Sequence, residues 1–86
     1  MKRIRILLAD DHKIFLDGLR SLLEPRFEIV GMVADGRALI SFVQKLHPDV
    51  IVVDISMPLL NGIEAVRQLK KLDPQVKVVF LTTAVR

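Results

Sequence analysis

Apolar and polar positions follow two different periods along the chain, and each period predicts a different kind of element. Short apolar runs bounded by polar residues predict buried strands, whereas apolar residues that recur every three or four positions predict amphipathic helices. The predicted strands cover residues 4–9, 27–34, 50–53 and 76–81. The predicted helices cover residues 12–24, the segment from Asp35-Gly36 to just before Pro48, and the segment from Gly62 to Asp73-Pro74.

Each predicted helix carries an apolar face that we expect to pack on a sheet. These faces are Phe15, Leu19, Leu22 and Leu23 in the first helix, Ala38, Leu39, Phe42, Val43 and Leu46 in the second, and Ile63, Val66, Leu69 and Leu72 in the third. Strands that are apolar on both faces and alternate with helices indicate a parallel sheet covered on two sides. We therefore expect one α/β domain over residues 1–86, a flavodoxin-like doubly wound parallel sheet with the strand order 2-1-3-4.

Composition removes several classes of function. The 86 residues include no cysteine, which excludes disulfides and thiolate metal sites, and no apolar run approaches the roughly 18 residues of a membrane span. The net charge of +3 comes from dispersed Lys and Arg, and the aromatic residues are four Phe, so no nucleic-acid reader is expected. We expect a cytoplasmic protein without membrane or direct nucleic-acid contact.

Acidic and hydroxyl side chains follow three of the predicted strands. Asp10-Asp11 follow the first strand, Asp54 ends the third, and Thr82-Thr83 follow the fourth. In the order 2-1-3-4 these strand ends lie side by side at the carboxyl edge, where doubly wound sheets bind ligands. Gathered carboxylates repel one another unless a cation is bound, and an all-oxygen set suits Mg²⁺. A strand-end aspartate can also act as a nucleophile toward a phosphoryl group.

Two of these positions have plainer interpretations. Asp11 alone is equally well explained as the N-cap of the helix that follows it. His12 and His47 lie near predicted helix ends, where solvated or dipole-compensating roles are favoured over a transition-metal site.

The segment Asp54-Ile55-Ser56-Met57-Pro58-Leu59-Leu60-Asn61-Gly62, together with Leu8-Ala9-Asp10-Asp11-His12 and Phe80-Leu81-Thr82, resembles the receiver domain of response regulators in two-component systems. The match follows the family order over the whole chain. Further segments, Asp17-Gly18-Leu19-Arg20 and residues 48–54, resemble the NarL/LuxR type in particular. There the receiver usually precedes a DNA-binding domain, and we expect no such domain within these 86 residues.

The resemblance implies a role for each matching residue. Asp54 would be the phospho-acceptor, Asp11 a direct Mg²⁺ ligand, and Asp10 a ligand acting through a coordinated water. Ser56 would offer its backbone carbonyl to the metal, and Thr82 would be the switch hydroxyl, with Thr83 as the alternative. Pro58 and Gly62 would shape the intervening loop, with Gly62 permitting a backbone conformation that is costly for other residues.

The resemblance also implies partners and a departure from the family. The phosphodonor would be a sensor histidine kinase, and the output would be transcription in the parent protein. In the family, a helix, a fifth strand ending in a phosphoryl-binding lysine and a final helix follow the threonine, so a chain ending at Arg86 would be a receiver domain incomplete at its C-terminus. The bared edge of strand 76–81 would then favour self-association.

Two other functions compete with this interpretation. A haloacid-dehalogenase enzyme would need a second aspartate two residues after Asp54, where this chain has Ser56. A non-catalytic interaction or dimerisation module with a vestigial acidic rim would show no saturable Mg²⁺ binding. The resemblance favours a phospho-acceptor regulator that is not an enzyme toward other substrates.

Overall fold

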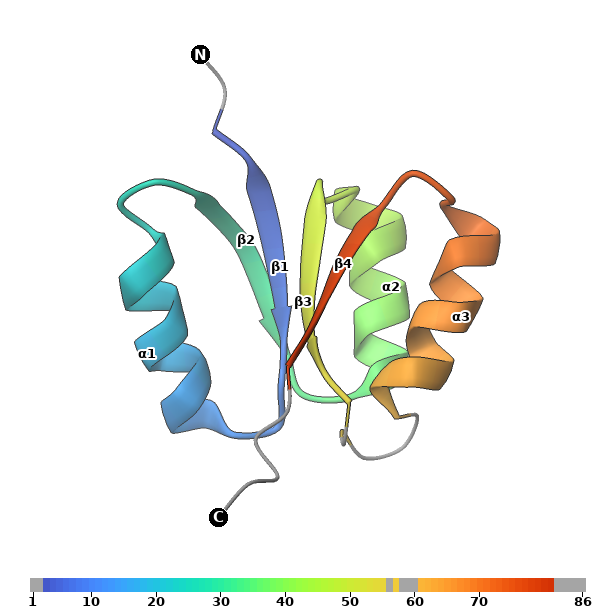
Figure 1. Cartoon of the computed structure of the whole chain (residues 1–86), viewed down its shortest axis with the longest axis horizontal. Helices are drawn as coiled ribbons and strands as arrows, with labels where there is room; N and C mark the ends of the chain where they lie inside the picture. Colours follow the sequence, from blue (N-terminus) through green and yellow to red (C-terminus); the bar gives the residue numbers. More distant parts are fainter. Residues whose placement is uncertain (1–2, 56, 58–60, 82–86) are drawn as a thin grey trace.

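The computed structural model describes residues 3–55, 57 and 61–81 of the chain. Strands and helices alternate along it, as the hydrophobic pattern predicts (Figure 1). In chain order they are β1 (Arg5–Ala9), α1 (Lys13–Leu23), β2 (Glu28–Val33), α2 (Gly36–Leu46), β3 (Val50–Asp54), α3 (Gly62–Leu72) and β4 (Lys77–Leu81). These bounds lie within one or two residues of the predicted ones.

The four strands form one parallel sheet in the order β2-β1-β3-β4. This confirms the predicted flavodoxin-like order. Ala9 of β1 pairs with Val53 of β3, so the residues that follow them, Asp10 and Asp54, come at the same level of neighbouring strands. Pairing of Asp54 with Leu81 brings the end of β4 to the same edge.

Helices cover the two faces of the sheet unequally. On one face α1 packs over β1 and β2, where Ile6, Leu8 and Leu16 form a small buried cluster. On the other face α2 and α3 pack against each other and the sheet, around a larger core that includes Leu7, Ile51 and Leu69 (Figure 1). No helix in the described ranges is long and apolar enough to cross a membrane.

The buried faces of α1 and α3 differ from the predicted ones. In α1 the buried residue is Leu16, whereas Leu22 of the predicted face is 79% exposed. In α3 Val66 and Leu69 are buried as predicted, but Ile63 is 52% exposed and Ala65 is buried in its place. The small Ala65 side chain lets the helix backbone approach the sheet, which turns the contact stripe away from Ile63.

Gly62 is required by close packing where α3 begins. A Cβ at this position would lie 2.5 Å from the backbone oxygen of Asp54 and 2.8 Å from Cγ1 of Val53. Among the described glycines none has a positive φ, so the expected conformational role of Gly62 is wrong. Its missing side chain lets α3 start directly against the end of β3.

We expect Gly62→Ala to lower the free energy of unfolding by about 1–3 kcal/mol, as overpacking does. Gly18→Ala is the matched control, because Gly18 lies in α1 and a Cβ added there would meet nothing within 4 Å. It should raise stability by about 0.5–1 kcal/mol through helix propensity. Urea denaturation of both variants measures the two effects, and a neutral Gly62→Ala would show that the contact with Asp54 relaxes freely.

Candidate functional site

The candidate site lies at the carboxyl edge of the sheet, where β1 and β3 end side by side. Asp10 is 2% exposed and Asp54 is fully buried, whereas Asp11 is exposed. The backbone N–H of Asp10 donates to the carbonyl of Val33 (3.0 Å), which fixes the chain as it leaves β1. The sheet thus holds two buried carboxylates and one exposed carboxylate in a single group, as the strand order predicts.

Asp10 has one carboxylate oxygen that is well satisfied and one that is not. Its Oδ1 accepts from the backbone N–H of His12 (2.9 Å) and contacts Nδ1 of the His12 ring (2.7 Å). Its Oδ2 is buried and has no hydrogen-bond partner among the described residues. A buried carboxylate oxygen of this kind is a candidate ligand atom, because leaving it unpaired is costly.

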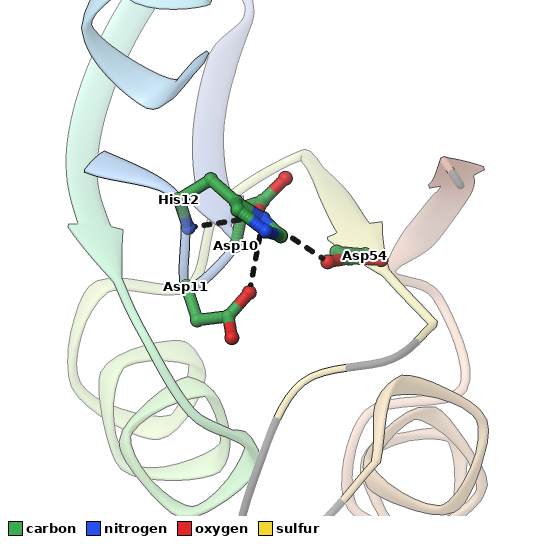
Figure 2. A group of neighbouring side chains, drawn as sticks. All are labelled: Asp10, Asp11, His12 and Asp54. Atoms are coloured by element: carbon green, nitrogen blue, oxygen red, sulfur yellow. Dashed lines mark hydrogen bonds and ion pairs between the residues drawn. The ribbon is translucent and has the colours of Figure 1, made fainter. Parts of the chain in front are cut away.

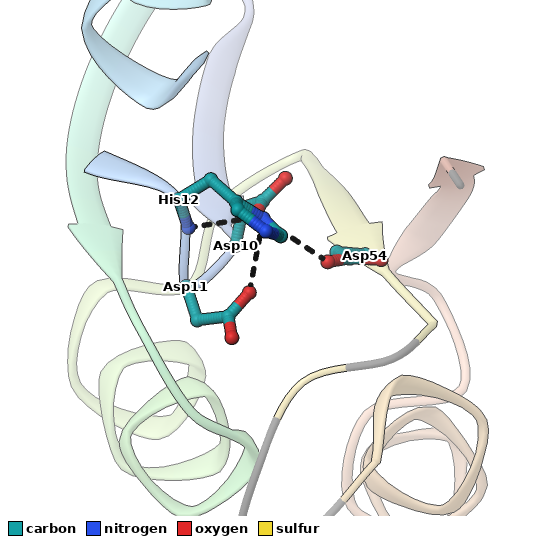
Figure 3. Close-up of polar contacts among 4 residues, drawn as sticks. All are labelled: Asp10, Asp11, His12 and Asp54. Atoms are coloured by element: carbon teal, nitrogen blue, oxygen red, sulfur yellow. Dashed lines mark hydrogen bonds and ion pairs between the residues drawn. The ribbon is translucent and has the colours of Figure 1, made fainter. Parts of the chain in front are cut away.

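The His12 ring lies over all three carboxylates (Figure 2). Its Nδ1 is 2.7 Å from Asp10, 3.1 Å from Asp11 and 3.9 Å from Asp54, as the dashed lines in Figure 3 mark. The ring is 45% exposed, so it covers the group from the solvent side. The hydrogen bond that the His12 ring donates to Asp10 raises the pKa of His12 above its ordinary value of 6.5. Partial burial opposes this, and the charges of Asp11, Asp10 and Asp54 add to it.

These contacts correct two interpretations made from the sequence. His12 is neither simply solvated nor placed to compensate a helix dipole, because its ring supplies a countercharge to the carboxylates when protonated. Asp11 is not the N-cap of α1: the N-cap is His12, and no side-chain bond caps the helix there. His47 does lie at a helix end, as the left-handed C-cap of α2.

The loop after Asp54 is anchored at both of its described ends. The backbone N–H of Ile55 donates to the carbonyl of Leu81 (3.2 Å), and that of Gly62 donates to the carbonyl of Ile55 (3.2 Å). Asn61 caps α3 by accepting from the backbone N–H of Glu64 (2.9 Å). Three predicted site residues, Ser56, Thr82 and Thr83, and the loop residue Pro58 lie outside the described residues.

The donor set fits a hard divalent cation. Each of Asp10, Asp11, His12 and Asp54 offers a ligand atom, and these atoms lie within 4.8 Å of one another. Three of the four are carboxylates, and carboxylate oxygens are the side-chain ligands that Mg²⁺ prefers. The buried Oδ2 of Asp10, which has no partner in the part of the chain that the structure describes, adds an acceptor that such an ion or its water could use. The residues present therefore fit Mg²⁺.

Comparison with known proteins shows the family. The model of the response regulator receiver domain family matches residues 6–86. The chain is 44% identical over 82 residues to the transcriptional regulatory protein DegU of Brevibacillus brevis, covering 93% of this chain and 35% of DegU. It is 41% identical over 80 residues to a protein-glutamate methylesterase/protein-glutamine glutaminase of Alkalilimnicola ehrlichii, covering 91% of this chain and 20% of that protein.

Solved structures agree with this match. The crystal structure of a LuxR-family two-component response regulator from Aurantimonas sp. SI85-9A1 is 31% identical, with a TM-score of 0.91 over 98% of this chain and 61% of that one. The chain belongs to the response regulator receiver domain family, and its similarity to the NarL/LuxR type is confirmed. It spans 35% of DegU and 20% of the methylesterase, so the whole-protein activities of these relatives are not carried over to it.

The raised pKa of His12 predicts a pH-dependent stability. A group whose pKa rises on folding stabilises the folded state fully when the pH is below the pKa of the unfolded chain. This stabilisation is lost as the pH rises through the pKa of the folded state. With EDTA present, we expect His12→Ala to lower the free energy of unfolding at a pH below 6.5 and the deficit to shrink as the pH rises above it. Urea denaturation across a pH series measures this.

His47→Asn is the control for this prediction. It removes the only other histidine of the sequence, at a position with φ of 48° that asparagine tolerates. A deficit in His12→Ala that does not vary with pH, or one that His47→Asn reproduces, would contradict the assignment of the effect to the carboxylate group.

Proposed function

We propose that this chain is a phospho-accepting signalling module in which Asp54 receives a phosphoryl group from a sensor histidine kinase. The observation that carries the proposal is the placement of a fully buried carboxylate at the end of β3, beside Asp10 and within 3.9 Å of the His12 ring. A carboxylate kept from bulk water beside other charged groups suits nucleophilic attack on phosphorus once its repulsion with the phosphoryl oxygens is offset.

The transfer proceeds by in-line displacement. An oxygen of the Asp54 carboxylate forms a bond to phosphorus as the bond from phosphorus to the donor nitrogen breaks, and the electron pair of that bond stays on the donor imidazole. The product on this chain is an acyl phosphate, and hydrolysis later returns the carboxylate and inorganic phosphate. With acetyl phosphate as donor, the bond that breaks is the one from phosphorus to the acyl oxygen.

Asp11 and Asp54 would hold Mg²⁺ directly, Asp10 would act through a coordinated water, and the backbone carbonyl of Ser56 would complete the protein ligands. When bound, Mg²⁺ would neutralise charge on the transferring phosphoryl group. The hydroxyl of Thr82, or of Thr83, would contact the phosphoryl group after transfer. The close packing of Gly62 on Asp54 supports the proposal, because it fixes the backbone from which the acceptor projects.

We expect treatment with acetyl phosphate and Mg²⁺ to add one phosphoryl group to Asp54, found by intact mass and by peptide mapping. The adduct should survive acid and be lost in base, as acyl phosphates are. Asp54→Asn should reduce it at least roughly tenfold, because an amide is a far weaker nucleophile than a carboxylate.

Asp17→Asn is the matched control, since it makes the same change on α1 outside the carboxylate group. It should leave the adduct unchanged. An adduct of the same mass that persists in Asp54→Asn would refute the assignment of the acceptor. EDTA should abolish the adduct in wild type if the cation is required.

Phosphorylation of the module would switch an output carried by the parent protein. Regulation of transcription is the output that fits best, because the chain is similar to a transcriptional regulatory protein and to a LuxR-family regulator. The methylesterase similarity covers only a fifth of that relative, so it supports a shared receiver module rather than a shared catalytic activity. Cytoplasmic localisation follows from the same proposal, because histidine-kinase phosphodonors transfer phosphate there.

Self-association is the partner interaction that the sheet edge supports. Within the described residues β4 pairs only with β3, and its Val79 and Phe80 are 48% and 46% exposed. Val79 lies in register with Val52, on the side of the sheet where α1 packs over β1 and β2 rather than over β4. An exposed apolar edge strand readily pairs with a second copy.

We expect a concentration-dependent rise in mass by sedimentation velocity, and we expect Val79→Lys to reduce it because charge on an edge strand opposes pairing. Ile63→Lys is the control, since Ile63 is similarly exposed but lies on α3 rather than on the edge strand. A monomer at all concentrations, or equal effects of the two variants, would contradict pairing through β4.

A further inference from the structure

His12 makes its contacts on the same carboxylates that are proposed to hold Mg²⁺. Its Nδ1 contacts Oδ1 of Asp10 and Oδ1 of Asp11 at 2.7 and 3.1 Å, and it lies 3.9 Å from Oδ2 of Asp54 (Figure 3). One ring nitrogen therefore lies near an oxygen of every carboxylate in the group. For Asp10 and Asp11, this ring is the cationic partner found among the described residues.

Mg²⁺ and the His12 ring would both bind the same carboxylate oxygens. Mg²⁺ requires near-octahedral coordination at about 2.0–2.1 Å and keeps several of its waters. The Asp11 oxygen that is 3.1 Å from the ring nitrogen belongs to a carboxylate that would bind the ion directly. The ring must give up at least its contact with Asp11 before the ion can be held there.

The ring is free to move without disturbing the backbone of the site. His12 makes no side-chain bond to the start of α1, and its ring is 45% exposed. The contact from its backbone N–H to Asp10 (2.9 Å) does not depend on the side chain. A rotation toward solvent would therefore release the carboxylates while leaving the turn between β1 and α1 intact.

We propose that His12 is a positioning residue that holds the carboxylates together in the metal-free form and competes with Mg²⁺ for them, turning toward solvent when the ion binds. This inference rests on the magnesium site of the proposed function. It implies that the His12 side chain weakens the affinity of the site for Mg²⁺, so that its removal strengthens binding.

The test is a Mg²⁺ titration at a single fixed pH, followed by backbone amide NMR signals of residues 10–12. We expect His12→Ala to bind Mg²⁺ roughly two- to fivefold more tightly than wild type, the size typical of a half-exposed charged contact. His47→Asn should bind as wild type does. Asp11→Asn, which removes a proposed ligand, should bind more weakly. Equal or weaker binding by His12→Ala would overturn the inference.

The His12 ring supplies a second, direct measurement. In wild type labelled with ¹⁵N in the imidazole, the Nδ1 signal of His12 should change with the same saturation curve as the amide signals, because the ring loses its carboxylate contact. A ring signal that stays constant while the amides saturate overturns the inference and leaves the magnesium site standing. Absence of saturable binding in wild type and in His12→Ala overturns the site and the inference together.

Discussion

The adjacency of β1 and β3 in the middle of a parallel sheet is the constraint on which the rest of this structure depends. Pairing of Ala9 with Val53 fixes the level at which both strands end, so Asp10 and Asp54 emerge together at one edge. Packing on both faces makes that register stable, because a shift of one strand by one residue would exchange its side chains between the two cores. The charged site is therefore positioned by hydrophobic packing several residues away from it.

Bringing two buried carboxylates together has an electrostatic cost that the sheet alone cannot offset. Removal from water and mutual repulsion both raise the energy of carboxylates held this close together. The protonated His12 ring offsets part of this cost from the solvent side, whereas Oδ2 of Asp10 has no hydrogen-bond partner within the described ranges. An acidic group with such a buried acceptor has the chemistry that the proposed Mg²⁺ site requires.

Much of the fold was predictable because it depends on periodicity. The β-branched run Val50–Val53 and the apolar run before Asp10 could hardly be other than buried strands, and the alternation with helices then limits the topology to a few parallel arrangements. The buried faces of the helices were less predictable. Leu16 and Ala65 are buried because of the orientation in which α1 and α3 pack on the sheet. The pattern of apolar residues had instead predicted Leu22 and Ile63 on the buried faces.

The part of the site missed from sequence, the contact of His12, has a local cause. The chain must turn sharply between the end of β1 and the start of α1, and that turn brings the ring back over the residues just before it, with its own N–H bonded to Asp10. A histidine next to an aspartate pair at a strand-to-helix turn was the available signal. A helix N-terminus is an unfavourable place for a cation unless carboxylates hold it there. A protonated histidine at this position therefore indicates a nearby acidic partner. The same turn that brings Asp10 into the carboxylate group therefore brings the His12 ring against it, so both positions arise from one short segment.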